Sequence, residues 1–153
     1  MARVDKLTRL VAVFDQFHNA IAPLDDPLAK QLAGNWASLR DRYVTPDGAP
    51  RSALATGMEQ GLREAPMLLG SMRPEVRKLA ADALAAAIKT HFPEFLAKDA
   101  ARLEKIKARG SIRGESEFYL VRHHIDILEG EAGPDAELRR LYELVDRFEA
   151  RRI

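Results

Sequence analysis

The sequence predicts an all-α fold, a compact single-domain bundle of six or seven helices. Apolar residues recur at spacings of three and four along most of the chain, which is the period of one helix face. No stretch alternates apolar and polar β-branched residues as a half-buried strand does. A length of 153 residues fits one domain that buries enough surface to fold without disulfides or metal. We therefore expect residues 1–153 to form a single helical domain around one core.

Proline, glycine and capping residues divide the apolar pattern into seven segments. The first run of apolar residues at helical spacing stops before Pro23, because a residue that precedes proline is pushed out of helical dihedral angles. Asp26 followed by Pro27 is a strong start signal, since the aspartate can cap free amides and proline loses no hydrogen bond at the first helical position. Helices are expected at about 4–21, 26–43, 52–64, 74–91, 93–109, 115–129 and 134–151.

The middle of the chain carries three features that affect packing. Gly57 and Gly61 each cost a helix about 1 kcal/mol relative to alanine, so we expect either a closely approaching helix or a partly irregular segment there. The helix at 52–64 should end before Pro66. The apolar connector 67–72 that follows should then lie against the core or a partner.

The second half of the chain begins with an alanine-rich helix at 74–91. Small side chains let helix axes approach closely, which favours this helix as the central one. Pro93 should break rather than kink the chain, and Gly110 should end the next helix. Gly130 and the pair Gly133–Pro134 should separate the last two helices.

Composition excludes several function classes. The chain has no cysteine, which rules out disulfides, thiolate zinc sites and a cysteine nucleophile. Its net charge of +1 is too small to steer a polyanion to the molecule as a whole. There is no Gly-x-Ser-x-Gly elbow and no glycine-rich phosphate loop, and no cofactor is expected. No apolar window is long enough for a secretory signal or a membrane span, so we expect a cytoplasmic protein without a membrane partner.

A stripe of positive charge is expected along the helix at 93–109. From 98 to 113 the sequence has six basic and two acidic residues, whereas 115 to 146 has nine acidic and three basic residues. One interpretation is binding of nucleic acid or another anionic partner. The favoured interpretation is that these charges stay solvated or pair within the chain. The candidate binding residues are Lys98, Arg102, Lys105, Arg109 and Arg113.

A second candidate cluster lies on the helix at 115–129. An imidazole held near a carboxylate is the unit from which general bases and metal sites are built. A hydrolase or metal-dependent enzyme would use these residues only if a histidine lined a cavity with two further polar groups. The spacing fits no known metal motif, and a structural role for the histidines is favoured. The candidate catalytic residues are Glu117, Tyr119, His123, His124 and Asp126.

The sequence as a whole therefore favours a non-enzymatic helical protein that binds another macromolecule, most simply a protein. An adaptor, an inhibitor and an immunity-type protein are all compatible with this interpretation. The charge-segregated hairpin at 98–146 and the apolar connector at 67–72 are the surfaces that favour it. A homodimer through Gly57 and Gly61 or through the last helix stays open. Nucleic-acid binding and enzymatic activity are the two alternatives.

Overall fold

The computed structural model describes residues 4–129 and 135–151, and every regular element in these two ranges is a helix. This confirms the all-α prediction, with one helix more than the upper expectation. The helices are α1 (Lys6–Ile21), α2 (Pro27–Leu39), α3 (Asp41–Val44), α4 (Arg51–Leu69), α5 (Pro74–His91), α6 (Glu94–Arg109), α7 (Glu115–Leu128) and α8 (Asp135–Arg151). Gly130 and Gly133–Pro134, which should separate the last two helices, lie outside the described residues.

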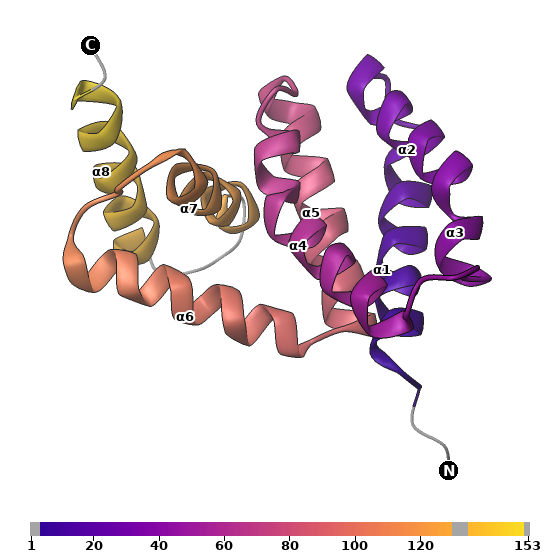
Figure 1. The fold of residues 1–153 in the computed structure, drawn as a ribbon. Helices are drawn as coiled ribbons and strands as arrows, with labels where there is room; N and C mark the ends of the chain where they lie inside the picture. Colours follow the sequence, from indigo (N-terminus) through magenta and orange to yellow (C-terminus); the bar gives the residue numbers. More distant parts are fainter. Residues whose placement is uncertain (1–3, 130–134, 152–153) are drawn as a thin grey trace.

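The helices form two groups that α6 connects (Figure 1). The first group contains α1 to α5, and the second contains α7 and α8, with α6 running beneath both. The alanine-rich α5 packs against α1, α4, α6 and α7, which agrees with its expected central position. Ala80, Ala81 and Ala87 are fully buried. Their small side chains allow neighbouring helices to approach α5 on several sides.

The predicted start and stop signals operate at most helix ends. The Asp26 carboxylate accepts a hydrogen bond from the Ala29 amide at 2.9 Å, and Pro27 opens α2. Gly110 ends α6 in the left-handed conformation, with φ of 80°. The helix is interrupted at Pro93, as predicted: α5 ends at His91 and α6 begins at Glu94. Local capping chemistry is visible in the sequence, so these boundaries could be placed within two residues.

Two of the predicted boundaries are wrong. The segment 26–43 forms two helices that are divided at Arg40, whose backbone keeps helical dihedral angles (φ −51°, ψ −43°). The Arg40 guanidinium binds both carboxylate oxygens of Asp15 at 2.8 and 2.9 Å. In addition, α4 continues through Pro66 to Leu69 instead of ending near residue 64. Proline inside a helix costs about 3 kcal/mol, and here burial of Pro66 together with Leu62 and Leu69 offsets that cost.

The buried apolar side chains form two clusters, which corrects the expectation of one core. The larger cluster belongs to α1, α2, α4 and α5 with the start of α6, and the smaller one to the end of α6, α7 and α8. Polar contacts connect the two groups: Arg77 Nε lies 2.7 Å from Asp126 Oδ2, and Lys78 Nζ donates to the Asp126 carbonyl at 2.7 Å. The periodicity of apolar residues shows which face of a helix is apolar, but it does not show which helices pack their apolar faces into the same cluster.

Candidate functional site

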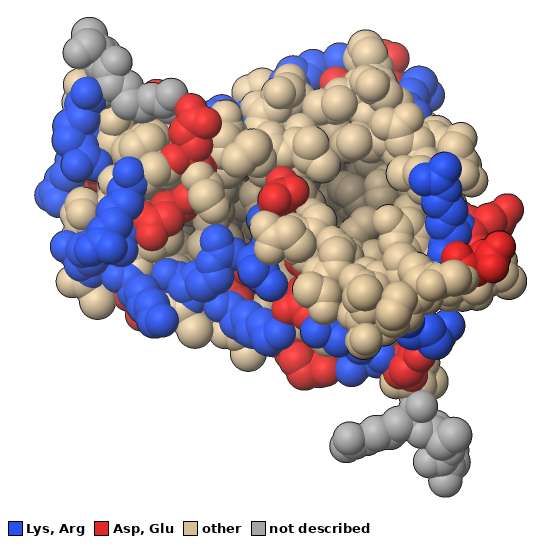
Figure 2. All heavy atoms as spheres, viewed as in Figure 1, with Lys and Arg blue, Asp and Glu red and all other residues tan. Residues whose placement is uncertain are grey.

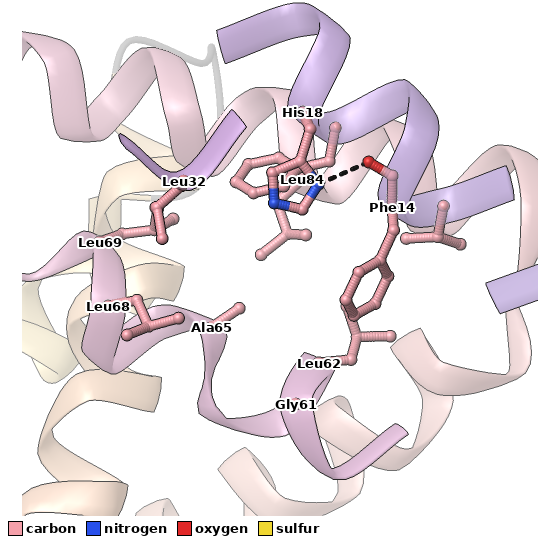
Figure 3. Close-up of a pocket in the computed structure, with 11 residues that line it drawn as sticks. Phe14, His18, Leu32, Gly61, Leu62, Ala65, Leu68, Leu69 and Leu84 are labelled. Carbon is pink, nitrogen blue, oxygen red and sulfur yellow. Dashed lines mark hydrogen bonds between the residues drawn. The ribbon is translucent and has the colours of Figure 1, made fainter. Parts of the chain in front are cut away.

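An apolar pocket opens between α1, α2, α4 and α5, with an internal volume of about 60 Å³ (Figure 3). In the space-filling view, a hollow among uncharged side chains lies in the same part of the molecule (Figure 2). His18 is the one polar side chain among the residues that line the pocket. These residues are Val13, Phe14, Phe17, His18, Leu32, Gly61, Leu62, Ala65, Leu68, Leu69 and Leu84.

The pocket exists because α4 presents two small residues at this place. Gly61 and Ala65 are one turn apart on the same face of α4, so neither fills the space opposite Phe14. A Cβ atom built on Gly61 would come no closer than 3.9 Å to Phe14 Cζ, and one on Gly57 would meet nothing within 4 Å. The two glycines therefore accommodate no closely approaching helix, which corrects that expectation. They also lie in regular helix, not in an irregular segment.

The rim of the pocket is apolar and partly exposed. Leu68 lines the pocket with 50% of its surface exposed, and its neighbour Met67 is 42% exposed. Leu69 and Met72 from the same segment are buried. In the apolar segment 67–72, some side chains are therefore buried in the core and others are exposed. Leu68 is exposed and also lines the pocket.

His18 places one polar ring at the edge of the pocket. Its Nδ1 donates a hydrogen bond to the Phe14 carbonyl at 2.7 Å, and its ring stacks on Trp36 with 5.6 Å between the centroids. Burial lowers the pKa of His18 below its ordinary value, so the ring is neutral at pH 7. With the proton on Nδ1, the Nε2 atom is a hydrogen-bond acceptor.

A wider polar hollow borders the pocket between α1 and α2, and His18 lines both. Trp36 Nε1 donates to Asp15 Oδ1 at 2.8 Å, beside the Arg40 guanidinium that binds the same carboxylate. Hydrogen bonds from Arg40 lower the pKa of Asp15, which keeps the carboxylate charged. Lys30 lies on the α2 side of this hollow. The apolar pocket and the charged hollow together form one amphipathic surface.

The predicted basic stripe on α6 is largely neutralised by carboxylates. Lys98 Nζ lies 2.7 Å from Glu59 Oε2, Arg102 pairs with Asp99 on its own helix, and Arg109 pairs with Glu117 of α7. In the described part of the chain, Lys105 and Arg113 form no such pair, and both are exposed. Lys98 and Arg109 therefore connect α6 to α4 and α7, whereas Lys105 and Arg113 present their charge to solvent.

The predicted catalytic residues are split between two places. Tyr119, His123 and Asp126 line a space of about 10 Å³ beside Arg77, which is enough for one water molecule. The Asp126 carboxylate there is bound by Arg77, and no hydrogen bond to His123 is found among the described residues. Burial lowers the pKa of His123 to about 3, so the ring is neutral at pH 7.

The other two candidates lie elsewhere. Glu117 binds Arg109 and accepts a hydrogen bond from the Arg113 amide at 2.7 Å. His124 is partly buried, and its Nε2 atom has no hydrogen-bond partner in the described structure. No group of three or more potential metal ligands occurs among the described residues. None of the described helices is long and apolar enough to cross a bilayer.

Comparison with known proteins adds no assignment. No protein-family model, curated protein or solved structure matches this chain. The apolar pocket was not among the predicted sites. The sequence feature that could have indicated the pocket is the pair of small residues Gly61 and Ala65, four positions apart on an otherwise apolar helix face.

Proposed function

We propose that this chain is a non-enzymatic binding protein whose partner is another protein. The partner inserts one branched aliphatic side chain into the pocket between α1, α2, α4 and α5. The observation that carries the proposal is an open apolar pocket with an exposed leucine at its rim. Interfaces are commonly anchored by a few side chains that fill such pockets.

The size of the pocket favours a side chain over a free ligand. Pockets for drug-sized molecules have volumes of about 300–1,000 Å³, and a cavity of about 150 Å³ holds benzene. A volume of about 60 Å³ suits the end of a leucine, isoleucine or valine side chain. Its apolar lining stabilises such a group by about 25 cal/mol for each Å² that leaves water.

The surroundings of the pocket favour an amphipathic partner segment. Leu68 extends the apolar surface on one side, and the hollow with Asp15, Lys30 and Arg40 adjoins it on the other. A segment that places an aliphatic residue in the pocket would bring its next polar residues over these charges. Charged groups at the edge of an interface give specificity and register more than affinity.

The test compares proteins captured from the native cell by the wild-type chain and by two pocket variants. Gly61→Leu fills the pocket from α4, where a new side chain has room. Leu68→Glu places a charge on the rim. We expect both variants to bind the same partner at least about 30-fold more weakly, which corresponds to a loss of about 2 kcal/mol at an anchor residue. Quantitative mass spectrometry identifies the partner, and calorimetry with the purified pair measures the affinities.

Leu79→Glu is the matched control. Leu79 is also a helical leucine, it is 54% exposed, and it does not line the pocket. Circular dichroism and urea titration of each variant establish that it is folded. The proposal is wrong if every protein captured by the wild type is retained by both pocket variants, or if the control loses the same partner.

A further inference from the structure

Three of the four arginines of α8 form a row, and no residue of α8 lines the apolar pocket. Arg140, Arg147 and Arg151 are separated by seven and four residues, which places them on one flank of the helix. At a rise of about 1.5 Å per residue, the row is about 16 Å long. All three side chains are exposed. Within the described ranges, none of the three guanidinium groups pairs with a carboxylate, in contrast to the stripe on α6.

Backbone carbonyls fix the two ends of this row. Arg140 Nη2 donates to the Lys107 carbonyl at the end of α6, and Arg151 Nη2 donates to the Ile112 carbonyl at 2.7 Å. A guanidinium has five N–H donors, so each arginine retains donors for a ligand after making these bonds. The side chains are therefore held in position before a ligand binds, which lowers the entropic cost of binding.

Charges of both signs border the row on this side of the molecule. Lys and Arg gather in a band over α8 and along α6 (Figure 2). Arg113 is exposed in the segment that Arg151 contacts, between α6 and α7. The helical positions of Asp146 and Glu149 place them on the opposite flank of α8 from the row. Glu143 is exposed and lies one helical turn from both Arg140 and Arg147, so its carboxylate is the acidic group that opposes binding of an anion at the row.

We propose that this arginine row binds the phosphodiester backbone of a nucleic acid without reading its bases. Arginine presents a planar fork of donors that matches phosphate oxygens. The exposed aromatic residue of α8, Tyr142, lies on the other flank, so the row offers no platform for base stacking. The large apolar side chains that are exposed on the described chain also lie off this flank, which disfavours insertion into a membrane.

The test measures binding of a fluorescein-labelled 20-base-pair DNA duplex of mixed sequence by anisotropy between 50 and 200 mM NaCl. Three phosphate contacts predict a log–log salt slope of about −2.7, or about 40-fold weaker binding at the higher salt concentration. Arg147→Ala should make this slope shallower by about one unit. Arg147 is the variant of choice because its side chain holds no described backbone carbonyl, unlike Arg140 and Arg151.

Arg139→Ala is the matched control, because Arg139 is an exposed arginine of α8 outside the row. It should leave affinity and slope unchanged. The proposal is overturned if the duplex does not bind at 50 mM salt, or if the two variants behave alike. Equal binding of polyglutamate or of phosphatidylserine vesicles would also overturn it, because it would show a surface for any anion. Because the row is on α8 and the pocket is not, this result is independent of the partner proposed above.

Discussion

At the scale of single residues, burial disfavours the charged form of three titratable groups, and their neighbours decide the direction in which each pKa moves. It raises the pKa of Asp99, whose neighbours Arg102 and Arg63 only partly compensate. Burial also opposes ionisation of Glu59, but hydrogen bonds from Lys6 and Lys98 outweigh it, and the pKa of Glu59 is lowered. Burial lowers the pKa of His123, the charge of His124 adds to this effect, and the neutral form of His123 is strongly favoured.

Stability should therefore decrease in acid, with His123 as a main cause. Between pH 6.5 and about 3 the unfolded chain binds a proton at this residue and the folded chain does not, so stability decreases as the pH falls. The contribution approaches about 1.4 kcal/mol per pH unit. Urea titrations at several pH values between 7 and 4.5 should show a shallower dependence for His123→Leu than for the wild type. His18 and His124 titrate in the same direction and leave a residual slope in the variant. Identical pH dependence in the two proteins would contradict this assignment.

At the scale of elements, α7 docks on α4 and α5 through specific close contacts. A Cβ atom on Gly70, directly after α4, would lie 2.6 Å from Tyr119 Cε1 and 3.2 Å from the Met67 carbonyl oxygen. Beside it, the ion pair between Arg77 and Asp126 is almost completely shielded from solvent. Loss of one member of such a pair leaves an uncompensated buried charge, which costs about 3–5 kcal/mol. These contacts set the position of the second helical group relative to the first.

The close contact at Gly70 predicts opposite effects of two similar substitutions. Gly70→Ala should destabilise the fold by about 1–3 kcal/mol, because the ring of Tyr119 and the end of α4 must move apart. Gly57→Ala should stabilise it by about 0.5–1 kcal/mol, because alanine favours the helix and the new methyl group meets open space. Free energies of unfolding from urea titration measure both effects. A neutral Gly70→Ala variant would mean that α7 is not held this closely.

At the scale of the whole molecule, the helices differ in how firmly they are held. The central α5 packs against four other helices, whereas α2 and α3 make their main contacts with α1 and with each other. Only Ala29 and Trp36 of α2 are buried, and α3 has no buried residue. Elements with few buried contacts open locally with a low free-energy cost. The α2 side of the pocket is therefore the wall most able to adjust to an inserted side chain.

Hydrogen exchange should reveal this difference between helices. We expect backbone amides of α2 and α3 to exchange before those of α1 and α5, because their opening exposes little apolar surface. Mass spectrometry of exchanged peptides at neutral pH measures the order. Binding of a partner in the pocket should slow exchange in α2. Uniform protection across the four helices would show that the molecule opens only as a unit.

Much of the fold could be predicted because its signals are local. Asp26 with Pro27, the break at Pro93 and the left-handed Gly110 each act within one turn of the chain. The helix end predicted before Pro66 is wrong, because residues outside its own segment help to bury this proline and burial offsets its cost in a helix. The partners of the basic stripe were also not specified, since Glu59 is 39 residues away from Lys98. The basic residues of α6 do not by themselves indicate which carboxylates they pair with.

The order of residues was enough to predict that the chain is helical, roughly where each helix begins and ends, and which face of each is apolar, because backbone hydrogen bonds and side-chain periodicity are short-range. Only tertiary packing shows that the apolar faces form two clusters, that Gly61 and Ala65 leave an open pocket, and that Arg140, Arg147 and Arg151 have no carboxylate partner among the described residues. Packing and ion pairing depend on distances between segments, and local patterns along the chain do not specify those distances.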